Sequence, residues 1–246
     1  MKIYGDISGF YDTFQTLRAK LPAGDDLSLG DMVDRGPKSN EVLEWFSKNG
    51  KAILANHEHM MQDFLRKLQE GSQYDMLYGS HIWLGNGGDK TMMSYGIDHA
   101  EFFQSSTVFS KIPKEHIDFI NNLPWFHQEP GFIFTHAPIM PRRDLAQVTT
   151  FKNAFELDNS ILWNRVLPKP REGVIQIYGH NSAPDCLIHC KLHPRGIYLE
   201  KFRDMYGSLK DNKDDIFALC LDTAGRGGKL SALVLPEFEI YQEEIK

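Results

Sequence analysis

The chain has 246 residues, of which 41% are hydrophobic, so it is long and apolar enough to bury a core, and its composition excludes an intrinsically disordered protein. A formal net charge of −6 at pH 7 excludes broad non-specific binding to nucleic acid, and no apolar run reaches the roughly 20 residues of a membrane-spanning helix. The three cysteines, an odd number, favour a reducing compartment over a disulfide framework, and we expect a cytoplasmic protein.

Short apolar segments alternate with amphipathic segments along the chain. The apolar segments predict strands over Lys2–Gly5, Leu27–Gly30, Ala52–Ala55, Phe132–Thr135, Val174–Tyr178, Ile216–Leu221 and Leu230–Leu235. Apolar residues at helical spacing predict helices near residues 10–21, 42–46 and 58–70. This alternation predicts an α/β fold with a mostly parallel sheet, and since no shift in composition divides the chain, we expect a single domain over residues 1–246.

Residues that can bind metal ions, namely Asp, Asn and His, follow five of the predicted strands. They are Asp6, Asp31 with Asp34, Asn56 with His57, His136 and His180. Any one of them alone is better interpreted as a helix cap or a turn residue. In a parallel sheet, however, these strand ends face the same crevice, where unpaired carboxylates would repel one another. Bound cations resolve that conflict, and the mixture of carboxylate, amide and imidazole favours Mn²⁺, Fe or Zn²⁺ over Ca²⁺.

Two arginines accompany these residues. Arg35 follows Asp34 directly, and Arg165 lies in the segment ILWNR. A guanidinium group matches two phosphate oxygens, so arginines beside a metal site indicate a phosphate-binding clamp. For Arg165 a surface salt bridge is the alternative interpretation.

Several motifs together resemble a known family. The segments GDISG, GDMVDRGPKS, LANHEHM, THAP, YGHN and LDTAGRGGKLSAL stand in the order and approximate spacing of the calcineurin-like metallophosphoesterases. They are most similar to the phosphoprotein phosphatases, which include bacterial and phage serine/threonine phosphatases and the related symmetrical diadenosine tetraphosphate hydrolases. The segment WLGNGGDKTMMSYG is similar to one in the bacterial members. This resemblance covers nearly the whole chain and implies two mixed β-sheets packed as a sandwich and flanked by helices.

The resemblance also implies a centre with two divalent metal ions, for which we expect Mn²⁺, with Fe or Zn²⁺ as alternatives. The first ion would be held by Asp6, Asp31 and the residue at position 8. The second would be held by Asp31, Asn56, His136 and His180.

The family pattern further implies catalytic and phosphate-binding roles. His57 matches the general acid that protonates the leaving oxygen, and Asp34 matches the carboxylate that orients it. Arg35, Asn56 and Arg165 match phosphate-binding positions.

The first motif departs from the family pattern at Ser8, where an imidazole ligand is expected. A neutral hydroxyl is a poor ligand for these metals, so the first ion should bind weakly. Three interpretations follow: an active site whose metal shell is completed by water, an engineered substitution, or a natural low-activity or binding-only member of the family. Leu54 is a further departure, because many eukaryotic protein phosphatases carry a phosphate-binding arginine there.

The segment CLIHCKLH offers Cys186, His189, Cys190 and His193 as potential zinc ligands. On a helix these residues would lie near one face. We discount a zinc site, since structural zinc sites usually draw their ligands from two separated pairs.

The sequence therefore predicts a metal-dependent phosphomonoester hydrolase that acts on phosphoserine or phosphothreonine in proteins. The alternatives are a hydrolase of diadenosine tetraphosphate or related nucleotides and a phosphate-binding scaffold with low activity. The expected partner is a phosphoprotein or a phosphorylated small molecule, with no nucleic acid and no membrane. The loops at residues 73–95 and 144–159 are expected to contact the substrate and determine specificity for it.

Overall fold

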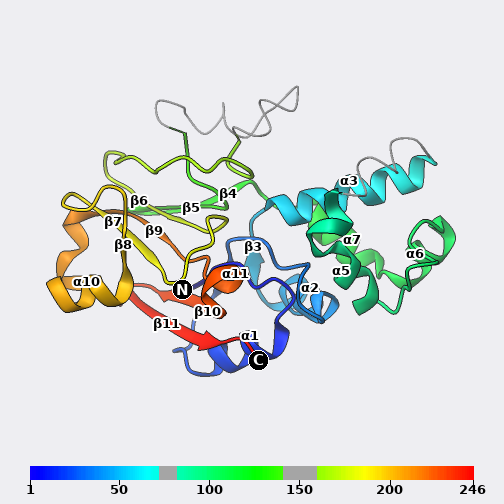
Figure 1. Cartoon of the computed structure of the whole chain (residues 1–246), viewed down its shortest axis with the longest axis horizontal. Helices are drawn as coiled ribbons and strands as arrows, with labels where there is room; N and C mark the ends of the chain where they lie inside the picture. Colours follow the sequence, from blue (N-terminus) through cyan, green and yellow to red (C-terminus); the bar gives the residue numbers. More distant parts are fainter. Residues whose placement is uncertain (72–81, 141–159) are drawn as a thin grey trace.

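The computed structural model describes residues 1–71, 82–140 and 160–246, which form two β-sheets with helices around them (Figure 1). The first sheet has the strand order β11-β10-β1-β2-β3. Its strands are β1 (Lys2–Tyr4), β2 (Asp26–Ser28), β3 (Lys51–Ala52), β10 (Lys229–Val234) and β11 (Glu239–Glu244). The second sheet has the order β4-β5-β6-β9-β7-β8. Its strands are β4 (Phe126–Glu129), β5 (Phe132–Thr135), β6 (Ile175–Tyr178), β7 (Leu187–Cys190), β8 (Ile197–Tyr198) and β9 (Ile216–Cys220).

Both sheets are mixed. In the first, β1, β2 and β3 run parallel, and β10 and β11 add to β1 in antiparallel fashion. In the second, β5, β6 and β9 run parallel, while β4, β7 and β8 are antiparallel to their neighbours. The two mixed sheets implied by the family resemblance are confirmed.

The core lies between the two sheets and beneath the helices. Residues that point between the sheets belong to one apolar cluster with members from both, such as Ile3 of β1, Phe134 of β5 and Leu233 of β10. Their neighbours in sequence face the other way: Tyr4 packs into a second cluster with side chains of the surrounding helices. The strands therefore alternate with the period of two that a half-covered sheet requires.

Helices on the outer side of the first sheet carry the second cluster. They are α1 (Tyr11–Ala19), α2 (Ser39–Asn49), α3 (Asn56–Glu70), α5 (Asp89–Ser94), α6 (Ser105–Lys111) and α7 (Lys114–Asn121), with the π-helical turn η1 (Leu84–Gly88) before α5. α3, α5, α6 and α7 form a helical group at one end of the molecule, and α10 (Leu199–Tyr206) lies at the other end beside the second sheet (Figure 1). No helix in the described ranges is long and apolar enough to cross a membrane.

The structure corrects the sequence reasoning in the C-terminal half. Residues Leu187–Cys190 form the strand β7, so His189 and Cys190 point to opposite faces and do not share the face that a helix would give them. His189 contacts the Tyr178 hydroxyl at 2.7 Å, and His193 contacts Tyr206 at 2.8 Å. The polar run Lys210–Asp215 forms the 3₁₀ helix η2. The Gly-rich turn before β10 contains the short helix α11 (Ala224–Gly227).

Candidate metal centre

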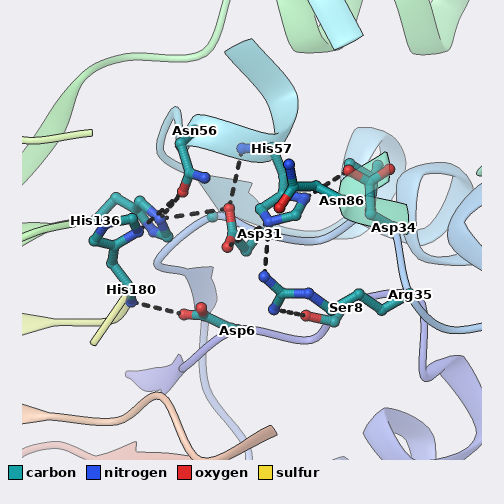
Figure 2. A network of polar contacts seen from close by, with 12 residues as sticks. Asp6, Ser8, Asp31, Asp34, Arg35, Asn56, His57, Asn86, His136 and His180 are labelled. Atoms are coloured by element: carbon teal, nitrogen blue, oxygen red, sulfur yellow. Dashed lines mark hydrogen bonds and ion pairs between the residues drawn. The ribbon is translucent and has the colours of Figure 1, made fainter. Parts of the chain in front are cut away.

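The carboxyl ends of parallel strands from both sheets meet at one buried edge, and polar residues follow each strand there (Figure 2). β1, β2 and β5 are followed by Asp6, Asp31 and His136. These three buried residues each offer a potential ligand atom, and the three atoms lie within 4.8 Å of one another. Asn56, at the start of α3, and His180, after β6, join them. The structure therefore brings together all the residues that the sequence predicted as metal ligands.

The two histidines are oriented by backbone carbonyls. His136 Nδ1 lies 2.9 Å from the carbonyl oxygen of Leu29, and His180 Nε2 lies 3.0 Å from that of Trp163. Burial lowers the pKa of His136, and burial with the neighbouring His136 lowers the pKa of His180 to about 3. Both imidazoles are therefore neutral at pH 7, and each carries its single proton on the nitrogen that faces a carbonyl.

The opposite ring nitrogens then present lone pairs to the centre. His136 Nε2 lies 2.7 Å from Asn56 Oδ1 and 3.4 Å from Asp31 Oδ1, and His180 Nδ1 lies 3.0 Å from Asn56 Oδ1. With the protons assigned in this way, the unprotonated nitrogens of His136 and His180 and the Asn56 Oδ1 oxygen direct their lone pairs into the same small space. Such a donor set, with carbonyls holding the outer N–H groups, fits a divalent cation.

Asp31 stands at the middle of the centre on a tightly held loop. The carboxylate of Glu58, from α3, accepts hydrogen bonds from the backbone N–H groups of Asp31 at 2.9 Å, Met32 at 2.8 Å and Val33 at 3.3 Å. Burial opposes ionisation of Asp31, but interactions with His136 and His57 outweigh it and hold the pKa of Asp31 below its ordinary value. Asp31 is therefore ionised and fixed in position.

Asp6 depends on a glycine for its position. The backbone N–H of His180 donates to Asp6 Oδ1 at 3.2 Å, and a Cβ atom at Gly179 would lie 2.3 Å from the same oxygen. Only glycine allows this approach of β6 to the end of β1. Burial raises the pKa of Asp6, and the nearby charges of Asp222 and Asp31 raise it further.

Backbone strain is concentrated at the centre. Of the non-glycine residues with positive φ in the described chain, all but Phe238 belong to the predicted site: Ser8, Asp31, Asp34, Arg35 and His180. Non-glycine residues adopt this region only where surrounding contacts hold them, and they cluster at functional sites. Here the loops hold one another, since Ser8 N–H donates to the Asp31 carbonyl at 2.7 Å and Gly36 N–H donates to the Ser8 carbonyl at 2.8 Å.

His57 and Asp34 form a buried pair beside the centre. His57 Nδ1 lies 2.5 Å from Asp34 Oδ2, and the His57 backbone N–H donates to Asp31 Oδ1 at 3.2 Å. Burial lowers the pKa of His57, but the charge of Asp31 and the hydrogen bond to Asp34 outweigh it, so that the pKa is raised overall. A carboxylate that holds an imidazole in its charged form is the arrangement of a general acid.

Two residues that sequence reasoning did not assign hold Asp34. The Trp83 indole Nε1 donates to Asp34 Oδ2 at 3.0 Å, and the Thr91 hydroxyl donates to Asp34 Oδ1 at 2.6 Å. Both come from the segment WLGNGGDKTMMSYG, which also accepts the Arg35 backbone N–H at the Gly87 carbonyl, 3.3 Å away. A Cβ atom at Gly87 would lie 2.6 Å from the Arg35 nitrogen, so glycine permits this contact. The similarity of this segment to bacterial family members was the available signal.

The two arginines take different positions. Arg35 Nη2 lies 2.8 Å from His57 Nε2, and Nη1 donates to Ser8 Oγ at 3.5 Å (Figure 2). The Ser8 side chain thus contacts a guanidinium group. Arg165 is exposed, and its Nη1 donates to the His180 carbonyl at 3.1 Å and approaches Asn181 Oδ1 at 3.5 Å.

Sequence reasoning also missed Asp222. It lies two residues after the last residue of β9, the third parallel strand of the second sheet, and is 1% exposed. Burial and the charge of Asp31 raise the pKa of Asp222 to about 6. The signal was the one used for the other strand ends, an acidic residue directly after a buried apolar strand.

Stacked mixed sheets that bring carboxylate, amide and imidazole groups to one buried edge, next to a histidine–aspartate pair, are the framework of a metal-dependent hydrolase. The chain belongs to the calcineurin-like phosphoesterase family, whose sequence profile matches residues 2–218. This family uses a centre with two metal ions, and the donor set described above fits it.

Named relatives are nucleotide hydrolases. The symmetrical bis(5'-nucleosyl)-tetraphosphatase of Actinobacillus pleuropneumoniae serotype 5b (strain L20) is 29% identical over 157 residues, which are 59% of this chain and 47% of that protein. The protein of the same name from Dechloromonas aromatica (strain RCB) is 27% identical over 188 residues, 73% of this chain and 56% of that protein. The chain thus spans about half the length of the curated relatives it matches.

A solved structure supports the fold alone. The metallophosphoesterase from Sphaerobacter thermophilus superposes with a TM-score of 0.55 at 13% identity. The match covers 100% of this chain and 89% of that one. At this identity the likeness concerns the arrangement of sheets and helices.

We expect Glu58→Gln to weaken Mn²⁺ binding about 10–100-fold, the usual cost of losing a group that positions a ligand. The amide has one acceptor oxygen instead of two and turns its NH₂ toward a backbone N–H, so the loop that carries Asp31 loses its support. The measurement is a Mn²⁺ titration followed by the EPR signal of free Mn²⁺. Glu70→Gln, an exposed change on the same helix, is the matched control, and equal affinities for both variants would contradict the role of Glu58.

Proposed function

We propose that this protein is a metal-dependent hydrolase of dinucleoside polyphosphates that cleaves a phosphoanhydride bond symmetrically. The observation that carries the hydrolase assignment is the His57–Asp34 pair directly beside the Asp31 centre. The names of the relatives favour a nucleotide substrate over the phosphoserine or phosphothreonine expected from the sequence. The absence of an arginine at Leu54 agrees with that preference.

The family resemblance assigns the ligands to two ions, and the closeness of these residues supports that assignment. Asp6 and Asp31 would hold the first, and Asp31, Asn56, His136 and His180 the second. When bound, the two cations neutralise charge on phosphate oxygens and lower the pKa of a water molecule. The mixture of carboxylate oxygens and imidazole nitrogens suits Mn²⁺, which we expect, with Fe or Zn²⁺ as alternatives.

His57 would protonate the leaving phosphate oxygen. Asp34 fixes the ring through Nδ1, which leaves Nε2 to carry the transferable proton. Trp83 and Thr91 in turn hold the Asp34 carboxylate, so the imidazole can move little. This chain of contacts aims the ring, and the raised pKa of His57 favours protonation of Nε2 once that atom is free.

Arg35 would couple phosphate binding to that proton. Its Nη2 now donates to His57 Nε2, and this bond keeps Nε2 as an acceptor. A phosphate group that binds the guanidinium draws Nη2 away and frees Nε2 to take up a proton next to the leaving oxygen. Arg165, at the rim beside His180, would bind a second phosphate, and Asn56 a phosphate oxygen at the centre. Residues 73–81 and 144–159, within the loops expected to read the substrate, lie outside the described residues.

The test is metal-dependent hydrolysis of diadenosine tetraphosphate with chromatography of the products. Symmetrical attack by water gives two molecules of ADP, whereas asymmetrical attack gives ATP and AMP. We expect ADP alone, and we expect His57→Asn to lower kcat about 10²–10⁴-fold, since general acid catalysis contributes that much.

A phosphothreonine peptide assayed in parallel separates the two substrate classes. Faster release of phosphate from the peptide would return the assignment to a protein phosphatase. Binding of the dinucleotide without turnover, at saturating Mn²⁺, would favour the scaffold alternative. An unchanged rate in the His57→Asn variant would contradict the role of His57.

The pH dependence gives an independent check on the pair. The charges of Asp31 and Asp34 raise the pKa of His57, so the acid form persists as the pH rises and kcat falls only above that raised value. Asp34→Asn removes one of these charges and should lower the pKa, which moves the alkaline limb of the kcat profile to lower pH. Thr91→Val keeps the Asp34 charge and serves as the comparison. An alkaline limb at the same pH in Asp34→Asn would exclude His57 as the group that titrates.

A further inference from the structure

Asp222 is a buried carboxylate that lacks a hydrogen-bond donor at one of its oxygens. The residue is 1% exposed, and its Oδ1 has no partner among the residues that the structure describes. A buried polar atom without a partner is uncommon and costs free energy, the more so when it carries charge. A water molecule, a proton or a cation would supply the missing partner.

The surroundings of Asp222 point to a cation. Asp222 follows β9 and Asp6 follows β1, and the charges of Asp222 and Asp31 both act on Asp6, raising its pKa beyond the effect of burial. β1 and β9 meet here closely, since a Cβ atom at Gly5 would lie 2.3 Å from the Leu221 carbonyl oxygen. Three acidic side chains thus share one buried edge, each at the end of a parallel strand. A proton shared by Asp6 and Asp222 would neutralise one of these two carboxyl groups, whereas a divalent ion held beside Asp31 would compensate the charge of both.

The first metal site also lacks a ligand. The family resemblance implies an imidazole at position 8, where this chain has Ser8, and the Ser8 hydroxyl lies 3.5 Å from a guanidinium nitrogen of Arg35. The second site already has an amide, two imidazoles and the shared Asp31. A further anionic group is therefore needed at the first site, next to Asp6.

We propose that Asp222 completes the first metal site in place of the imidazole that is absent at position 8, binding the ion directly or through one of its water molecules. The first site is then built from oxygen ligands on Asp6, Asp31 and Asp222. This inference rests on the two-metal centre of the proposed function and is independent of the substrate.

The experiment measures Mn²⁺ binding to the full chain after metal removal, by EPR of free Mn²⁺ and by calorimetry. We expect two ions per chain in the unsubstituted protein, and about 10–100-fold weaker binding of the weaker ion in Asp222→Asn, with the tighter ion unchanged. Ser8→His in the Asp222→Asn background should restore the lost affinity by supplying an imidazole to the same ion. Asp222→Ser is measured in the same way if the Asn variant does not fold.

Thermal unfolding distinguishes a ligand from a structural aspartate. Metal-free Asp222→Asn should unfold at the same temperature as the unsubstituted protein or higher, because a buried repulsion is removed, but it should gain less from added Mn²⁺. Asp26→Asn is the matched control: Asp26 is buried in β2 with Lys2 at 3.0 Å, so this change should lower Tm and leave both Mn²⁺ affinities unchanged.

Two results would overturn the inference. The first is binding of two Mn²⁺ ions to Asp222→Asn with unchanged affinities. The second is a single ion bound to the unsubstituted protein, which would also remove the first site from the proposed function. Failure of the dinucleotide assay with Mn²⁺ binding as expected would overturn the substrate assignment alone.

Discussion

The structure depends on a single constraint: parallel strands from two stacked sheets end at the same buried edge, and acidic side chains follow three of them. Asp6, Asp31 and Asp222 are each almost fully buried there. Such a concentration of negative charge costs several kcal/mol for each unpaired ion. Arg35, His57 and a few backbone N–H groups offset part of this cost, and bound cations would offset the rest. Metal binding and folding would then be linked, because the folded protein creates the site and the ion removes electrostatic repulsion there.

The loops around the centre are held in place partly by contacts from other elements of the fold. Glu58 reaches from α3 to hold three successive N–H groups of the loop that contains Asp31, while Ser8 and Gly36 bond to one another across two loops. These contacts hold residues such as Asp31 at a φ of 48°, a conformation that an isolated loop would leave. The apolar core between the sheets and under α1–α3 fixes the strands from which the loops start. The positions of the site residues therefore depend on the packing of both sheets and their helices.

The sequence predicted the central strands and the residues at their ends, because a buried strand followed by a polar residue is a local pattern. The strands it missed at the sheet edges have polar or very short sequences, such as β11 and the two-residue β8. β7 was not among the predicted strands, because its alternating cysteine and histidine residues gave no clear apolar run. The support of Asp34 by Trp83 and Thr91 could not be predicted, since it joins residues 49 and 57 positions away along the chain. Such contacts are set by the fold and leave no periodic signal.

Ser8 gives the two halves of the centre different chemistry. With Asp222 as proposed, the first site has carboxylate oxygens only, whereas the second combines Asn56 and Asp31 oxygens with the nitrogens of His136 and His180. Carboxylate ligands suit Mg²⁺ and Mn²⁺, while imidazole adds affinity for Zn²⁺ and Fe. The exchange of one imidazole for one carboxylate therefore changes which ion the first site selects as well as how tightly it binds. If Asp222 binds the first ion, the residue at position 8 would thus influence which metal the centre selects.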